Sequence, residues 1–298
     1  MRTLLACLLL MGAARGLGQG TEPSVGSKVV IKYAKPLRVE DRIVDDGTTF
    51  RVYAVEKVDG GFLWLVSGRV RGRVPASDVV PFDRAVDFYS DEIRKMPGNS
   101  AAHVWRGLSL KELGRLDAAL DDFTEAIRLN PDVARAYVNR GNVWQAKGDY
   151  DRAIADYNEA IRIEPRATWA TNNRGHARGM KKEYDRAIAD YNEAIRLDPK
   201  NPEPYNNRAW EWATCPDPRI RDGKKAVESA RKACELGGFQ DANHVGTLAA
   251  AYAEAGDFDQ AMTWERAAIK LPAADENERK GRRERLALYQ ARKPYRRP

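Results

Sequence analysis

The stretch YDRAIADYNEAIR, residues 150–162, returns without a change at residues 184–196, 34 positions further along the chain. Prolines keep the same interval, at Pro97, Pro131, Pro165 and Pro199. Self-similarity at a fixed period of this length indicates stacked helical repeats instead of a single globular core. Such arrays form long surfaces that hold another molecule, and they seldom build an active site.

Small residues recur at three places within each repeat. The eighth place holds Gly107, Gly141, Gly175, Ala209 and Ala249, the twentieth holds Ala119, Ala153, Ala187, Ala226 and Ala261, and the twenty-seventh holds Ala126, Ala160, Ala194, Ala233 and Ala268. Small side chains allow two antiparallel helices to approach closely. We expect an aromatic residue at place 24 (Phe123, Tyr157 or Tyr191) to fill the space toward the next unit, and the proline to end the second helix.

This arrangement resembles the tetratricopeptide repeat over residues 100–275. The resemblance implies a mainly α fold, a right-handed α-solenoid of about five helix pairs whose first helices build a concave groove. Residues 83–99 are predicted to form a capping half-repeat helix, and residues 276–298 a charged helix with a basic tail. In the fourth unit, place 20 arrives five residues late, and the extra residues lie in a turn-rich loop, residues 214–223, between its two helices.

Residues 21–82 follow a different pattern. Short runs rich in Val, Tyr, Phe and Trp, divided by glycines, predict antiparallel strands. Residues 71–80, RGRVPASDVV, resemble the closing strand, single helical turn and last strand of a bacterial SH3-like barrel. The resemblance implies a small all-β SH3-like domain that precedes the repeats. Its aromatic residues suit either a core or a ligand groove, so a cell-wall component as its ligand stays open.

Residues 1–20, MRTLLACLLLMGAARGLGQG, have the charge, the short apolar core and the small residues of a secretory signal peptide. They predict export to the periplasm, the cell envelope or the medium, with no integral membrane segment once the signal is removed. Cys215 and Cys234 would then lie in a compartment that permits a disulfide. Two buried free thiols are the alternative.

Charge and motifs argue against several classes of function. The formal charge is +7, of which about +5 lies in residues 275–298, and short charged ends are typically solvated, so nucleic acid is not an expected partner. The three histidines, His103, His176 and His244, are far apart, and neither a phosphate-binding glycine loop nor a nucleophile elbow occurs. The sequence therefore predicts no metal, no cofactor and no enzymatic activity.

The predicted partner site is the concave face of the first helices. Its expected lining is Arg135, Asn139, Asn142, Gln145, Trp169, Asn172, Asn173, His176, Asn206, Asn207 and Trp210. Carboxamides can bond a peptide backbone because each carries two donors and an acceptor, and tryptophans are common interface anchors. The same side chains can instead satisfy neighbouring helices, and both interpretations stay open.

Charged residues accompany this face. Arginines recur at place seven (Arg106, Arg140, Arg174, Arg208), and aspartates recur at place 23 (Asp122, Asp156, Asp190). We interpret them as structural pairs within each repeat; the alternative is a line of positive charge that binds an acidic peptide or phosphate. In the chaperone-binding branch of the family, a clamp of basic residues and asparagines binds two carboxylates. Asn142 and Asn173 match its asparagines, but Val138, Glu203 and Asn207 stand at its basic places.

Together these features predict a non-catalytic scaffold or adaptor that binds a peptide or helix of a partner protein in the groove. The alternative is a cell-envelope anchoring module, whose SH3-like domain binds a cell-wall component while the repeats dock a partner.

Overall fold

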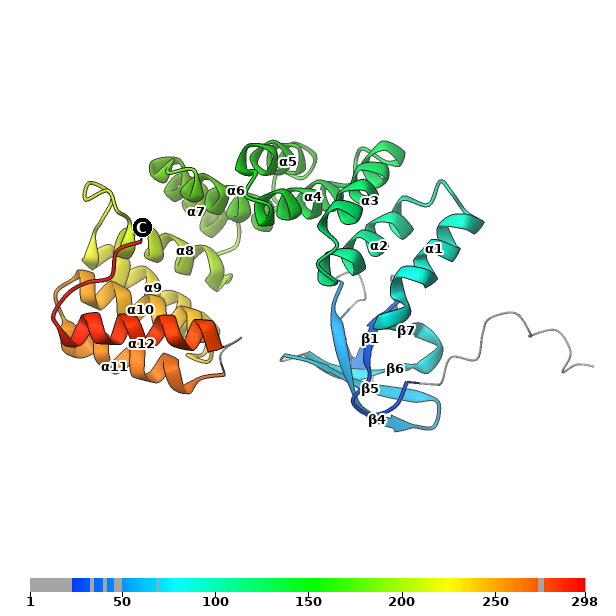
Figure 1. Ribbon diagram of the computed structural model, residues 1–298, viewed down its shortest axis with the longest axis horizontal. Helices are drawn as coiled ribbons and strands as arrows, with labels where there is room; N and C mark the ends of the chain where they lie inside the picture. Colours follow the sequence, from blue (N-terminus) through cyan, green and yellow to red (C-terminus); the bar gives the residue numbers. More distant parts are fainter. Residues whose placement is uncertain are drawn as a thin grey trace, which may run out of the picture. The chain divides into compact units, whose positions relative to one another are not determined.

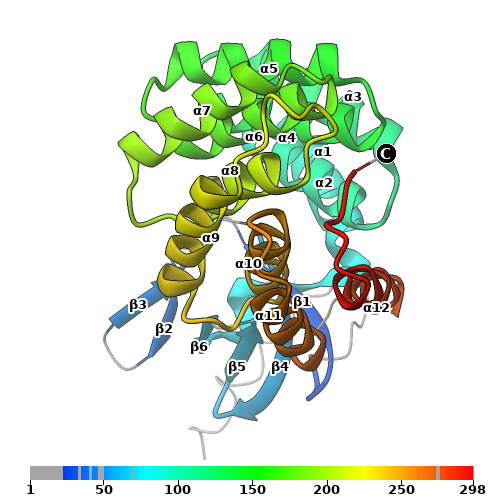
Figure 2. The same cartoon turned by 90° about the vertical axis from the view of Figure 1, so that its left-hand side faces the viewer.

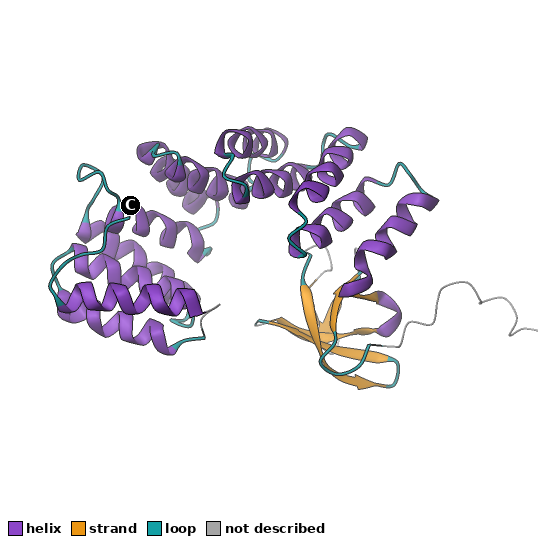
Figure 3. Ribbon diagram, in the orientation of Figure 1, coloured by secondary structure: helices purple, strands orange, loops and turns teal. Residues whose placement is uncertain are grey.

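The computed structural model describes residues 23–32, 35–39, 42–45, 50–68, 70–272 and 276–297. These residues hold seven strands, two short 3₁₀ turns and twelve helices (Figures 1 and 3). The predicted signal peptide, residues 1–20, lies outside them, so export stays a prediction. Contacts divide the chain into two compact units, residues 1–109 and 110–298.

The first unit contains an antiparallel sheet of order β3-β2-β6-β5-β4-β1-β7. The strands are β1 (Lys28–Ile31), β2 (Leu37–Val39), β3 (Arg42–Asp45), β4 (Val52–Asp59), β5 (Phe62–Ser67), β6 (Val70–Pro75) and β7 (Val79–Pro81). Alternate residues of a strand face the same side, so Tyr53 and Val55 of β4 meet Leu63 and Leu65 of β5 in one buried core. The helical residues that end this unit belong to α1 (Ala85–Lys95) and α2 (Ser100–Glu112).

The predicted succession of strand, helical turn and strand is present as β6, the 3₁₀ turn Ala76–Asp78 and β7. Two short strands, β2 and β3, were not predicted, because three or four residues carry too weak an alternation signal. Tyr53 belongs to the core, whereas Phe62 is exposed beneath the guanidinium of Arg73. The resemblance to an SH3-like barrel remains a prediction.

The second unit is built of helix pairs. They are α3 (Leu116–Leu129), α4 (Ala134–Ala146), α5 (Tyr150–Ile163), α6 (Thr168–Met180), α7 (Tyr184–Leu197), α8 (Pro202–Thr214), α9 (Gly223–Gly237), α10 (Ala242–Glu254), α11 (Phe258–Lys270) and α12 (Glu276–Gln290). Figure 2 shows α5 and α7 in one row, with α4, α6 and α8 in a second row beneath them. The predicted insertion is the loop between α8 and α9.

The small-residue places behave as predicted. The alanines at places 20 and 27 are buried, and so are the aromatics Phe123, Tyr157 and Tyr191. A Cβ atom at Gly141 would lie 2.8 Å from Cε1 of Tyr157, and one at Gly175 would lie 2.8 Å from Cε1 of Tyr191. Glycine at place eight is thus what allows the aromatic of the second helix to lie against the first helix.

Helix α12 packs on the last helix pair through its buried apolar residues. Tyr289 is fully buried in a cluster with Ala249, Ala253 and Ala261. On the same helix, Arg282 donates to the carbonyl oxygen of Ala242 at 2.7 Å. The last pair is therefore covered by a helix that contacts it through a buried tyrosine and a buried arginine.

Candidate partner-binding face

Asparagines from three successive first helices form one hydrogen-bonded row. Asn173 of α6 donates to Oδ1 of Asn142 in α4 at 3.0 Å, and Asn207 of α8 donates to Oδ1 of Asn172 in α6 at 3.0 Å. Asn172 and Asn173 are linked at 3.4 Å. With Asn206, which donates to Asn207 at 3.5 Å, these five residues are called the asparagine row below.

The two ends of the row differ. At the α4 end, the hydroxyl of Tyr157 donates to Asn142 at 2.8 Å and to Gln145 at 3.3 Å. Burial raises the pKa of Tyr157, so this hydroxyl stays a donor. At the α8 end, Oδ1 of Asn206 is buried and accepts no hydrogen bond from any other described residue. The side chains of the row thus form hydrogen bonds with neighbouring helices, as the second interpretation of this face predicted. One acceptor, Oδ1 of Asn206, has no partner among the described residues.

The two predicted tryptophan anchors are both engaged within the chain. Trp169 packs against the buried cluster of the second and third repeats. Trp210 has the ring of Tyr295 5.9 Å away and the guanidinium of Arg285 5.9 Å away. Of the remaining predicted residues, Arg135 and His176 are exposed, and Asn139 is half-buried.

The arginines at place seven are structural. Arg140 holds Asp156 through two bonds of 2.7 and 2.9 Å, and Arg174 holds Asp190 through bonds of 2.7 and 3.1 Å, which confirms the predicted pairing in these two repeats. Arg174 also donates to Asn158 of the preceding repeat at 2.8 Å. Where the fourth repeat lacks the aspartate, its arginine donates to a serine hydroxyl instead. The arginines therefore tie helices and repeats together.

The structure shows why the two-carboxylate clamp is not formed here. Val138 is buried in the core of its repeat, and Asn207 belongs to the asparagine row. Glu203 lies 3.1 Å from Nε2 of His244. None of these three places supplies the cation that an acidic peptide end requires.

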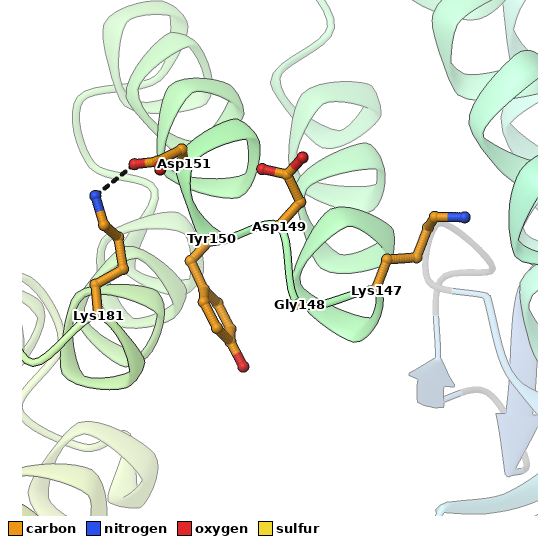
Figure 4. Close-up of a pocket in the computed structure, with 6 residues that line it drawn as sticks. All are labelled: Lys147, Gly148, Asp149, Tyr150, Asp151 and Lys181. Carbon is orange, nitrogen blue, oxygen red and sulfur yellow. Dashed lines mark hydrogen bonds and ion pairs between the residues drawn. The ribbon is translucent and has the colours of Figure 1, made fainter.

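A shallow hollow of about 480 Å³ lies between the second and third repeats (Figure 4). Its lining consists of Lys147, Gly148, Asp149, Tyr150, Asp151 and Lys181. Lys181 forms an ion pair with Asp151, and Lys147 pairs with Asp117, so each lysine links one repeat to the repeat before it. Because both cations are already paired between repeats, the hollow is explained by repeat packing.

Metal ligands and thiols are the other groups that could give a site its chemistry. No group of three or more His, Cys, Asp or Glu side chains in the described residues is arranged to hold a metal ion. Cys215 and Cys234 are buried free thiols, and burial raises the pKa of Cys234 to about 12. None of the described helices combines the length and apolar character that crossing a membrane requires.

Comparison with known proteins identifies the repeats. Residues 106–168 match a family model described as tetratricopeptide repeat, and residues 180–209 match one described as TPR repeat. These two stretches are tetratricopeptide repeats. No curated protein matches the sequence.

Two solved structures share the fold over about 70% of this chain, and a third, YrrB, is similar at a lower score. A chain of the APC/C hetero-tetramer Cut9-Hcn1 is 16% identical, with a TM-score of 0.61 over 70% of this chain and 40% of that one. Yeast Tom70 is 20% identical, with a TM-score of 0.55 over 69% of this chain and 43% of that one. YrrB, a TPR protein with an unusual peptide-binding site, is 17% identical, with a TM-score of 0.48 over 67% of this chain and 100% of that one. The chain spans less than half the length of the first two.

The sequence did not predict the contacts that the last described residues make with the fourth and fifth repeats. The last described residues, Tyr295, Arg296 and Arg297, contact Trp210, Glu254 and Glu211. The only signal for this contact in the sequence is Glu211 at place ten of the fourth repeat, because the other repeats have a small or apolar residue at that place. A buried carboxylate requires a cationic partner, but the sequence does not say which one.

Proposed function

We propose that this chain is a non-catalytic scaffold that binds a segment of a partner protein along the asparagine row. The supporting observation is the row itself, a line of half-buried carboxamides across three repeats. A peptide backbone presents donors and acceptors at regular spacing, which carboxamides can match from either side.

Two further points support the proposal. The Cut9-Hcn1 structure, similar in fold, is a hetero-tetramer, so a chain with this fold does act within a protein assembly. Because residues 1–20 have the pattern of a secretory signal, the proposed partner is a protein of the cell envelope or its surroundings.

The test places a photo-crosslinking amino acid at Asn139, on the face, and in a second protein at Arg196, which is exposed on the second helix α7. We expect a discrete crosslinked partner from position 139 that is absent from position 196. The crosslinked segment is then made as a peptide, and its affinity is measured by calorimetry.

A double variant, Asn173→Ala with Asn207→Ala, removes two donors of the row. If each carboxamide forms one hydrogen bond with the partner segment, each substitution removes about 1 kcal/mol of binding free energy, and the affinity for the segment should fall roughly tenfold or more. Circular dichroism checks that the variant is folded. Equal crosslinking from both positions, or unchanged affinity in the folded double variant, would remove the row from the proposed function.

A further inference from the structure

The residues after α12, 291–297, turn back and reach the end of α8 (Figure 1). This segment is called the tail below. Its backbone is tied to the repeat, because the amide of Arg297 donates to the carbonyl oxygen of Thr214 at 3.1 Å. Residues 294–297 are half-buried, although two of them are arginines, a residue type that is mostly exposed.

The centre of the contact is a buried carboxylate. Glu211 has a side chain that is 4% exposed, and both of its oxygens accept from the guanidinium of Arg297, one of them at 3.2 Å. Burial raises the pKa of Glu211, and the charge of Arg297 opposes that effect. Gly179 of α6 leaves room for this carboxylate, since a Cβ atom there would lie 2.7 Å from Oε1 of Glu211.

Aromatic rings and a second carboxylate surround this pair. The guanidinium of Arg297 lies 5.8 Å from the ring centre of Tyr184, within the range of a cation–π contact. Tyr295 lies beside Trp210, with ring centres 5.9 Å apart. Glu254 forms an ion pair with Arg296, and the same carboxylate is also paired with Arg221 at 3.2 Å.

These contacts resemble the recognition of a peptide. An aromatic ring lies beside an aromatic ring, a planar guanidinium meets a carboxylate through two bonds, and a backbone amide bonds a carbonyl at the end of a helix. A bidentate arginine contact is selective, because an ammonium group cannot reproduce its planar geometry.

We propose that Tyr184, Trp210, Glu211 and Glu254 form a binding site for a basic peptide with the order aromatic-arginine-arginine, and that the tail is its internal occupant. The inference rests on the proposed function, capture of a partner segment by the repeats, and names the chemistry of that segment. A partner segment of the same chemistry displaces the tail and takes over its contacts.

The charges explain why the site selects a basic occupant. When the tail leaves, Glu211 loses the guanidinium that compensates its burial, and an unpaired buried carboxylate is strongly disfavoured. Glu254 keeps Arg221, so it depends less on the tail. An acidic segment would add charge of the wrong sign beside Glu211. The site is therefore either covered by the tail or filled by another arginine.

The test uses full-length proteins and a fluorescein-labelled peptide with the sequence of residues 291–297. The tail-release variant carries Tyr295→Ser and Arg297→Ser. Its matched control is Arg292→Ser, which removes an exposed arginine of the same segment. A tethered occupant competes at an effective concentration of about 1 mM, so we expect the release variant to bind the peptide roughly tenfold or more tightly than the wild type and the control. Binding is followed by fluorescence anisotropy.

Peptide variants keep the test independent of protein folding. A peptide with Gln in place of Arg297 should lose at least about tenfold in affinity for the release variant, whereas Gln in place of Arg292 should change little. Equal affinity of the wild type and the release variant would overturn the inference, as would indifference to Gln at position 297 or preference for an acidic peptide of the same length.

Two alternative outcomes are separated in the same samples. Sedimentation that shows a dimer of the wild type, lost in the release variant, would mean that the tail exchanges between copies and would overturn the partner interpretation. If crosslinking at Asn139 persists while the basic peptide fails to bind, the inference about the tail is wrong and the proposed function stands. If the peptide binds but no partner is captured at Asn139, the asparagine row is excluded and the tail site stands.

Discussion

Gly175 provides the sharpest test of how these repeats are packed. It is the eighth residue of its repeat, where α6 lies against α7. A Cβ atom there would stand 2.8 Å from Cε1 and 3.0 Å from Cδ1 of Tyr191, and 3.1 Å from Cβ of Asp190. Tyr191 is only 1% exposed and Asp190 is held by two arginines, so neither neighbour can move away easily.

Two opposing effects determine how the substitution Gly175→Ala changes the free energy of unfolding. Alanine in a helix interior is favoured over glycine by about 1 kcal/mol, and overpacking of a buried contact costs about 1–3 kcal/mol. The variant should therefore be destabilised by up to about 2 kcal/mol. The control is Gly281→Ala in α12, where no atom lies within 4 Å of the added Cβ. Gly281→Ala should show only the stabilisation that alanine gives a helix, so the free energies of unfolding of the two variants should differ by about 1–3 kcal/mol.

The free energy of unfolding is measured by urea denaturation followed by circular dichroism at 222 nm. Repeat arrays can unfold in parts, so hydrogen exchange of amides in α6 and α12 should accompany the denaturation curves. If Gly175→Ala stabilises its helix as much as Gly281→Ala does, the close contact with Tyr191 is not a constraint and the steric reasoning about place eight is wrong.

Three other predictions concern charged and reactive groups. Asp190→Ala leaves Arg174 and Arg178 without their carboxylate partner and should lower the free energy of unfolding, measured in urea, by about 3 kcal/mol. A loss below about 1 kcal/mol would show that water replaces the carboxylate as the partner of these arginines. Surrounding protein atoms and the charge of Arg297 lower the pKa of His176, so Arg297→Gln should raise that pKa in an NMR titration; a fixed value would mean that the tail does not reach it. A lowered histidine pKa favours the neutral form in the folded protein. The contribution of His176 to the free energy of unfolding is therefore present above pH 6.5 and is lost as the pH falls through the folded pKa. The Arg297→Gln variant should lose less stability over this pH range. Cys234, whose pKa is raised to about 12, should resist iodoacetamide at pH 8 until urea unfolds the protein, as read by mass spectrometry.

The order of the helices could be predicted from sequence because the requirements of a repeat are local and periodic. A small residue at place eight, an aromatic at place 24 and a closing proline each act within one unit, so each repetition in the sequence is a repetition in space. The strands β2 and β3 could not be predicted in this way, because short strands are defined by their neighbours in the sheet.

The candidate face was predicted only in part. Its asparagines were placed on the first helices by their position in the repeat, but which amide reaches which depends on the separation of α4, α6 and α8. Whether a place-seven arginine meets an aspartate or a serine was likewise set by what the second helix offers.

By itself, the sequence determined that the chain stacks helix pairs and that carboxamides line one face, since both follow from a 34-residue period. Only the tertiary structure decided what covers the end of that face. Glu211 and Arg297 are 86 residues apart, and Trp210 meets a tyrosine at the far end of the chain. No periodic signal links such distant residues. A buried carboxylate selects its partner by burial and geometry, which exist only once the chain has folded.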